Sequence, residues 1–140
     1  MVKNNLDVLK SVVENGFGKC NLAIFDELIN DSYIEPQFAM HGGKEGLKKS
    51  VLSLHSAFPD MHYELLDSCE SGDMIWVHYK ASGTHTGIFM QLPPSGKKFT
   101  IDVIDRARVS DGKIIEHWGM PDRFALMHQL GMFDIKPVLK

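Results

Sequence analysis

The apolar side chains of this chain change their spacing at Met61. Before Met61 they recur every three or four residues, which is the spacing of one helix face. After Met61 they recur at every second residue, as on one face of a β-strand. Because the helical segments come first and the strands follow, the order predicts an α+β fold rather than alternating strands and helices. The clearest alternating face carries Ile75, Val77, Tyr79 and Ala81.

Three amphipathic helices are predicted in the first part of the chain. Each has an apolar stripe and a residue that favours its start or its end. The segment Tyr33–Met40 is predicted to be extended, because Pro36 resists helix. The helices are Asn5–Asn15, ended by Gly16 and Gly18; a helix capped by Asn21 that carries Leu22, Phe25, Leu28 and Ile29; and a helix after Gly42-Gly43 that ends before Pro59.

Four strands and a short helix are predicted in the second part. Ser71-Gly72-Asp73 and Asp111-Gly112 have the composition of tight turns, which indicates that the strands form antiparallel hairpins. The predicted strands are Met61–Leu65, Met74–Ser82, Phe99–Val109 and Ile114–Trp118, and the helix is Arg123–Leu130.

Composition narrows the classes of partner and compartment. The chain has 140 residues, a length typical of a single domain, which we expect to span 1–140. Its net charge is −3 with no block of like charge, so neither nucleic acid nor a membrane is an expected partner. No signal peptide or apolar span is recognisable, and we expect a cytoplasmic protein. Cys20 and Cys69 have no motif spacing and are predicted to be free, buried thiols.

Four stretches resemble the SnoaL-like polyketide cyclases of the nuclear transport factor 2-like superfamily. The resemblance extends over about Asn5–Met132 and implies a cone-shaped, curved, mostly antiparallel sheet. Three N-terminal helices would pack on its concave face, a short C-terminal helix would follow, and a pocket would lie between helices and sheet. One departure is that Tyr33–Gln37 lacks a histidine that family members often carry there. The matching stretches are Phe58-Pro59-Asp60, Gly83–Gly87, Leu92–Gly96 and Asp111–Asp122.

Asp122 is the first candidate for acid–base chemistry. In the family that the chain resembles, an aspartate after this Glu-His-Trp strand shuttles the proton of an intramolecular aldol closure. The resemblance therefore implies the same role for Asp122. The alternative is a helix N-cap before Arg123, since aspartate is a favoured cap. One residue can do both.

Asp105 is the second candidate, because it interrupts the apolar face of the strand Phe99–Val109. A carboxylate among inward-facing apolar residues needs a partner or must hold a proton, and either state suits acid–base work. Two alternatives remain open. A β-bulge can turn Asp105 outward, or the carboxylate can pair with Arg106, Arg108 or Lys80.

Three histidines are candidates for a supporting role. His55 lies at the edge of the third helix's apolar stripe and is proposed to assist catalysis. His85 and His117 are proposed to orient a substrate oxygen or to pair with a carboxylate. The alternative for each is a histidine satisfied within the core. The aromatic residues supply core and cavity walls, and the candidates for substrate contact among them are Trp118, Tyr79 and Phe58.

No cofactor or metal is predicted. The seven histidines are scattered, and the chain has no His-Glu-x-x-His sequence, no paired-cysteine site and no phosphate-binding glycine loop.

These features together predict a cofactor-free enzyme that moves a proton next to the carbonyl of a small, mostly apolar compound. Aldol-type cyclisation or isomerisation is the expected chemistry. Two alternatives stay open: a binding domain without catalysis, and an enzyme that adds or removes water. A homodimer that pairs through the outer face of the sheet is also expected, because Met74 and Trp76 point away from the predicted core.

Overall fold

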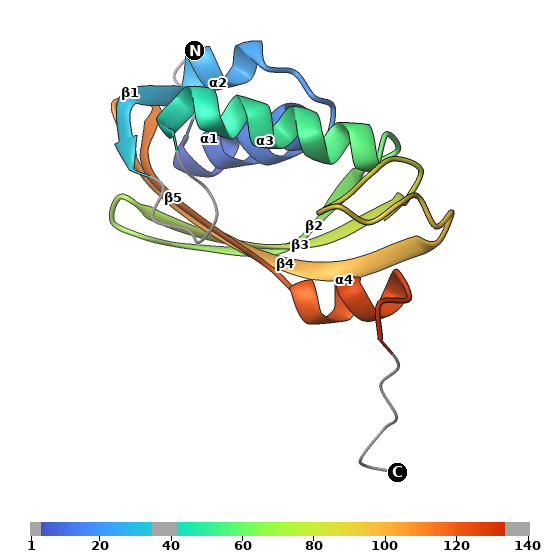
Figure 1. Cartoon of the computed structure of the whole chain (residues 1–140). Coiled ribbons are helices and arrows are strands. Elements are labelled where there is room, and N and C mark those ends of the chain that lie inside the picture. The colour runs from blue at the N-terminus through green and yellow to red at the C-terminus, as the bar shows by residue number, and fades with distance from the viewer. Residues whose placement is uncertain (1–3, 35–41, 134–140) are drawn as a thin grey trace.

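A curved five-stranded sheet forms the centre of the computed structural model, which describes residues 4–34 and 42–133 (Figure 1). The strand order is β1-β5-β4-β3-β2, with β1 parallel to β5 and all other neighbours antiparallel. The predicted α+β class and the mostly antiparallel sheet are confirmed. The strands are β1 (Ile29–Ile34), β2 (His62–Ser71), β3 (Met74–Thr84), β4 (Lys98–Ser110) and β5 (Lys113–Pro121).

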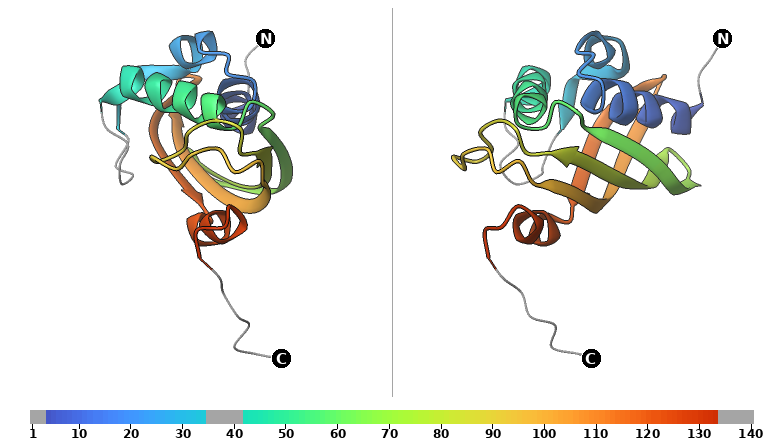
Figure 2. Two further views of the ribbon diagram at one scale, coloured as in Figure 1. Left: turned by 45° about the vertical axis from the view of Figure 1, so that its right-hand side comes forward. Right: turned by 90° about the vertical axis from the view of Figure 1, so that its right-hand side faces the viewer.

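The N-terminal helices cover the concave side of the sheet, as the resemblance implied. Figure 2 shows the strands curling beneath them without closing into a barrel. The fourth helix, α4, lies apart from the others beside the end of β4 (Figure 1). No helix in the described part of the chain is long and apolar enough to cross a membrane. The helices are α1 (Asn5–Ser11), the π-helical turn η1 (Val12–Phe17), α2 (Ala23–Leu28), α3 (Gly43–Ala57) and α4 (Arg123–Gln129).

The first helical segment continues past Gly16 and ends at Gly18, the second of the two glycines predicted to stop it. It begins at the cap Asn4, whose side chain accepts the Asp7 N–H at 2.8 Å, and continues into η1 through Gly16. Gly16 is needed for packing: a Cβ there would lie 2.7 Å from Cζ of Phe25. The prediction that Gly16 ends the helix was therefore wrong, because the close approach of α2 explains this glycine.

The second helix and the first strand also differ from the prediction. α2 begins after Leu22 with no side-chain cap, so Asn21 does not act as the expected N-cap. Ile29 is already the first residue of β1, because the buried apolar run joins the sheet beside β5 instead of extending the helix. Of the predicted extended segment, Tyr33 and Ile34 are in β1, and residues 35–40 lie outside the described residues.

α3 confirms the third predicted helix. It begins after Gly42, whose φ of 91° lies in the left-handed region that favours glycine. It buries Leu47 and Val51 against the core and ends just before Phe58 and Pro59.

β2 is longer than the alternation predicted. The strand continues to Ser71 with a bulge between Leu65 and Asp67, and its last residues are exposed at the edge of the sheet. These last residues bury no face, so they show no alternation of apolar side chains. The predicted strand therefore ended too early, at Leu65. Both cysteines are free as expected, but Cys69 is exposed on β2, so the prediction of a buried thiol was wrong for it.

The three remaining strands bury alternate residues against the helices. The predicted inner faces of β3 and β4 are confirmed, and each forms part of one core with α1 and η1. The deepest side chains of this core include Tyr79, Phe25, Phe58, Leu9, Ile75 and Ile114.

Candidate active site

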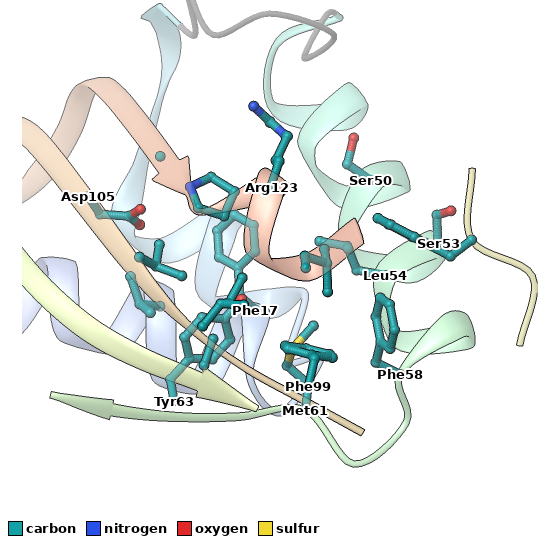
Figure 3. A pocket seen from close by; sticks show the side chains of 18 of the residues that line it. Phe17, Ser50, Ser53, Leu54, Phe58, Met61, Tyr63, Phe99, Asp105 and Arg123 are labelled. Atoms are coloured by element: carbon teal, nitrogen blue, oxygen red, sulfur yellow. The ribbon is translucent and has the colours of Figure 1, made fainter. Parts of the chain in front are cut away.

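A cavity of about 570 Å³ lies between the helices and the concave face of the sheet. Its walls come from η1, α3, the inner faces of β2–β5 and the start of α4 (Figure 3). Most of the lining is apolar or aromatic, as in small-molecule sites generally. The polar side chains of the lining are Ser50, Ser53, Tyr63, Asp105, His117 and Arg123.

Asp105 and His117 form a buried pair in the wall of this cavity. Nε2 of His117 lies 3.2 Å from Oδ2 of Asp105, and the two residues are 3% and 6% exposed. A carboxylate and an imidazole at this distance can share, take up and return a proton. The inward orientation predicted for Asp105 is observed, and its partner is the histidine of the next strand rather than Arg106, which pairs with Glu116.

A register shift in the β4–β5 hairpin turns His117 inward. Ser110 lies opposite Lys113 and Val109 opposite Ile114, but Ala107 lies opposite His117. One additional residue of β5 is therefore inserted after Ile114, and it reverses the facing of the residues that follow. Without this bulge, Glu116 would face the cavity and His117 would face outward.

Tyr63 lines the cavity on the β2 side. Its ring meets Tyr79 edge-on, with ring centres 5.9 Å apart. Burial raises the pKa of the Tyr63 hydroxyl far above its usual value, and the charge of Asp105 raises it further. The phenol therefore stays protonated and can only act as a neutral donor or acceptor. The sequence analysis treated Tyr63 as one aromatic among several. Its position two residues from Met61 on the inner face of β2 was the available signal.

The cavity has exposed polar residues on the side of α3 and α4. Arg123, the first residue of α4, and Ser53 of α3 both line it and are exposed (Figure 3). Ser50 also lines it, but its hydroxyl is bonded to the Gly46 carbonyl at 3.1 Å. Arg123 forms no ion pair within the described part of the chain, so its charge is available to a ligand.

Asp122 is located between two lining residues, Pro121 and Arg123, but is not itself among those that line the cavity. Its carboxylate accepts the Ala125 N–H at 3.0 Å, which makes it the N-cap of α4. The side chain is exposed. The cap is therefore present, and the acid–base role of Asp122 stays a prediction.

The structure does not bring His55 and His85 to the Asp105 pair. His55 is partly exposed on α3 and does not line the cavity. His85 is buried at 1% exposure, and its Nδ1 lies 2.9 Å from Oγ of Ser95. This bond links the two ends of the segment between β3 and β4, and the His85 ring centre lies 5.6 Å from that of Phe58. The assisting role in catalysis for His55 and the substrate contact for His85 stay predictions.

The three aromatic candidates occupy different places. Phe58 lines the cavity. Tyr79 is buried beside it, and its hydroxyl donates to Oε2 of Glu14 at 2.8 Å. Trp118 follows His117 on β5, and its indole N–H donates to Glu116 at 3.1 Å. Neither Tyr79 nor Trp118 is among the lining residues.

Comparison with known proteins places this arrangement in a family. The model of the SnoaL-like polyketide cyclases matches residues 8–130. The chain belongs to the SnoaL-like polyketide cyclase family. Aklanonic acid methyl ester cyclase DnrD of Streptomyces peucetius is 30% identical over 110 residues, which are 75% of this chain and 76% of that protein. Nogalonic acid methyl ester cyclase of Streptomyces nogalater is 27% identical over 110 residues, 76% of this chain and 82% of that protein.

Solved structures agree with this family and fold. TsrD from Streptomyces laurentii superposes with a TM-score of 0.83 at 25% identity, over 92% of this chain and 96% of that chain. Wild-type IdmH from Streptomyces antibioticus superposes with a TM-score of 0.80 at 28% identity, over 92% of this chain and 99% of that chain. The curved, unclosed sheet is thus the nuclear transport factor 2-like fold that the resemblance implied.

Proposed function

We propose that this protein is a cofactor-free cyclase that closes a ring in a small apolar carbonyl compound, with Asp105 as the proton-transferring group. The observation that carries the proposal is the Asp105–His117 pair in the wall of an otherwise apolar cavity. Family membership supports cyclisation as the reaction class.

The proposed reaction is an intramolecular aldol closure. The Asp105 carboxylate removes a proton from the carbon next to one carbonyl group, and the electron pair of the C–H bond moves to give an enolate. The enolate carbon attacks a second carbonyl carbon of the same molecule, and one C–C bond forms. Asp105 returns its proton to the resulting alkoxide. His117 holds the carboxylate in place and donates a hydrogen bond to it.

The form of the cavity supports a flat substrate with one polar end. Aromatic and aliphatic walls favour a ring system, and the exposed polar side chains of Ser53 and Arg123 favour a polar substituent. Two relatives are named for the methyl esters of aklanonic and nogalonic acid, and we propose a substrate of that chemical class.

Two aspartate variants test which carboxylate moves the proton. With aklanonic acid methyl ester and nogalonic acid methyl ester as probes, Asp105→Asn is expected to lower turnover by roughly two to four powers of ten. Asp122→Asn is the matched variant, because asparagine also caps helices well and the melting temperature should change little. We expect it to keep near-normal turnover.

The other outcomes reassign the function. A large loss in Asp122→Asn with a small loss in Asp105→Asn would transfer the proton shuttle to Asp122. No turnover of either probe by the wild type, with measurable affinity for the probes, would favour the binding domain without catalysis. Incorporation of water oxygen into a product would favour the enzyme that adds water.

We also propose that the chain forms a homodimer through the outer face of the sheet. Large apolar side chains remain exposed there, with Ile104 on β4 opposite Met120 on β5 and Trp76 nearby on β3. Sedimentation at micromolar concentration should show a dimer, and Trp76→Glu should shift it to monomer. Leu52→Glu is the control, because Leu52 is also a large exposed apolar residue but lies on α3. A monomeric wild type would refute the proposal.

A further inference from the structure

Besides the exposed Ser53 and Arg123, one polar side chain of the cavity lining has no partner within the described residues. Asp105 is bonded to His117, and the Ser50 hydroxyl is bonded to the Gly46 carbonyl. The hydroxyl of Tyr63 forms no hydrogen bond to any residue in 4–34 or 42–133. Tyr63 is only partly buried and lines the cavity, so its hydroxyl is available to bond a ligand atom there.

The ring that carries this hydroxyl is held in place. Its edge-on partner Tyr79 is itself anchored, because the Tyr79 hydroxyl donates to Glu14 of η1. Gly18 also packs close to the ring: a Cβ at that glycine would lie 3.3 Å from Cδ2 of Tyr63. A donor fixed in this way needs little reorganisation to meet a ligand atom.

The location of Tyr63 matches where charge would develop. It lines the same cavity as Asp105 and comes from a different strand, β2, so one molecule in the cavity can contact both residues (Figure 3). Its protonated state is secured by burial and by the carboxylate charge, as described above. A neutral phenol can donate to an oxygen that becomes negative, whereas a phenolate could not.

We propose that Tyr63 donates a hydrogen bond to the substrate carbonyl oxygen whose neighbouring C–H is deprotonated by Asp105. This inference rests on the cyclisation proposed above and adds the group that stabilises its enolate. As Asp105 takes the proton, the negative charge moves from the carboxylate to the substrate oxygen held by Tyr63. The net charge of the cavity is unchanged, and the hydrogen bond strengthens as the enolate forms.

The kinetic test removes one oxygen atom. Tyr63→Phe should lower kcat for aklanonic acid methyl ester by roughly a hundredfold to a thousandfold, the weight of one oxyanion donor, while KM changes little. Tyr33→Phe is the matched control, since it deletes the same atom from a buried tyrosine outside the cavity, bonded to the Gly43 carbonyl at 3.3 Å. We expect this control to keep kcat. If the Tyr63 hydroxyl is only structural, Tyr63→Phe should instead lower the melting temperature and leave kcat unchanged at temperatures well below melting.

A binding test does not depend on turnover. The probe is 4-nitrophenol, which ionises near neutral pH to a coloured, planar oxyanion, and nitrobenzene is the analogue without the oxygen. In the Asp105→Asn protein, which lacks the repelling carboxylate, the nitrophenolate should bind more tightly than nitrobenzene. Adding Tyr63→Phe should weaken nitrophenolate binding by roughly tenfold to a hundredfold and leave nitrobenzene binding within about twofold.

The two tests separate the two proposals. Equal affinities of nitrophenolate with and without the Tyr63 hydroxyl, or no preference over nitrobenzene, would overturn the role of Tyr63 even if Asp105→Asn is inactive. Near-normal turnover in Asp105→Asn would overturn the proposed base, whereas the loss of nitrophenolate affinity in Tyr63→Phe would still support an oxyanion donor at this position.

Discussion

A pair of an acid and a base lies on the inner face of the β4–β5 hairpin, and another such pair lies on its outer face. On the inner face His117 and Asp105 lie 3.2 Å apart, and their side chains are 4% and 8% exposed. On the outer face Arg106 and Glu116 lie 2.8 Å apart, and their side chains are 25% and 27% exposed. Asp105 is followed by Arg106 on β4, and Glu116 is followed by His117 on β5. The same two strands therefore supply both pairs.

The surroundings of the two pairs are opposite in kind. The outer pair belongs to a polar network: the Arg106 guanidinium lies over the rings of Trp76 and Trp118 at 5.5 and 5.4 Å, and Trp118 donates to Glu116. The inner pair faces an apolar cavity. Buried ionisable pairs seldom stabilise a fold more than apolar residues of the same size would. The inner pair is therefore better explained by chemistry than by stability.

The largest effect on stability is expected from breaking the inner pair. His117→Phe would leave the Asp105 carboxylate buried without this partner, and we expect the free energy of unfolding to fall by about 3 kcal/mol at neutral pH. The double variant Asp105→Leu/His117→Phe should recover most of this loss, because it leaves no ionisable group there, yet it should have no cyclase activity. Urea unfolding of the three proteins measures the comparison.

A loss in the double variant as large as in the single variant would show that the inner pair is itself needed for folding. That result would weaken the contrast between the two faces, because it would give the inner pair a structural role.

A smaller loss is expected from an inner-face hydrogen bond that lies outside the cavity. Tyr79→Phe removes the hydroxyl that donates to Glu14 of η1, so the Glu14 carboxylate loses a charge-assisted hydrogen bond. We expect a decrease of about 2 kcal/mol in the free energy of unfolding, without a change in the shape of the cavity. Thermal unfolding measures the decrease. An unchanged melting temperature would mean that water replaces the lost donor and that this part of the inner face is not dry.

The outer pair should matter less. Arg106→Met keeps a long apolar side chain between the two indole rings but removes the charge and the bond to Glu116. We expect the free energy of unfolding to fall by at most about 1 kcal/mol, and the difference from wild type to shrink as salt is added. A loss of about 3 kcal/mol would place this pair in the same energetic class as the inner one.

Much of the inner face followed from alternation alone. The apolar period of β3 and β4 predicted which residues are buried, because one buried face fixes the register of a strand. It put Asp105 on the inner face, although an outward turn at a β-bulge was left open. The helices followed from their stripes, except at their ends. The π-helical turn was not predicted, and the close contact of its Gly16 with Phe25 of another helix is not encoded in a local pattern.

The pairing of Asp105 with His117 could not be predicted from the sequence. Alternation shows that His117 faces opposite to Glu116 and Trp118, but the inserted residue after Ile114 decides which of these faces is the inner one. Tyr63 was missed as a site residue for a similar reason: that its hydroxyl is unbonded depends on what surrounds it in space, and no local pattern encodes that.

The smallest effect concerns pH and the outer face. Oδ1 of Asp102 lies 2.8 Å from Nε2 of His78 and 3.2 Å from Nζ of Lys80. The hydrogen bonds from His78 and then Lys80 lower the pKa of the Asp102 carboxyl below its usual value. A carboxyl with a lowered pKa in the folded state stabilises the fold above the unfolded-state value, and this contribution is lost as the pH falls through the folded-state value. Wild type should therefore melt slightly above Asp102→Asn at neutral pH, and the two melting temperatures should converge in acid. A difference in melting temperature that persists in acid would show that Asp102 acts through packing rather than charge. The outer face would then not differ from the inner face in this respect.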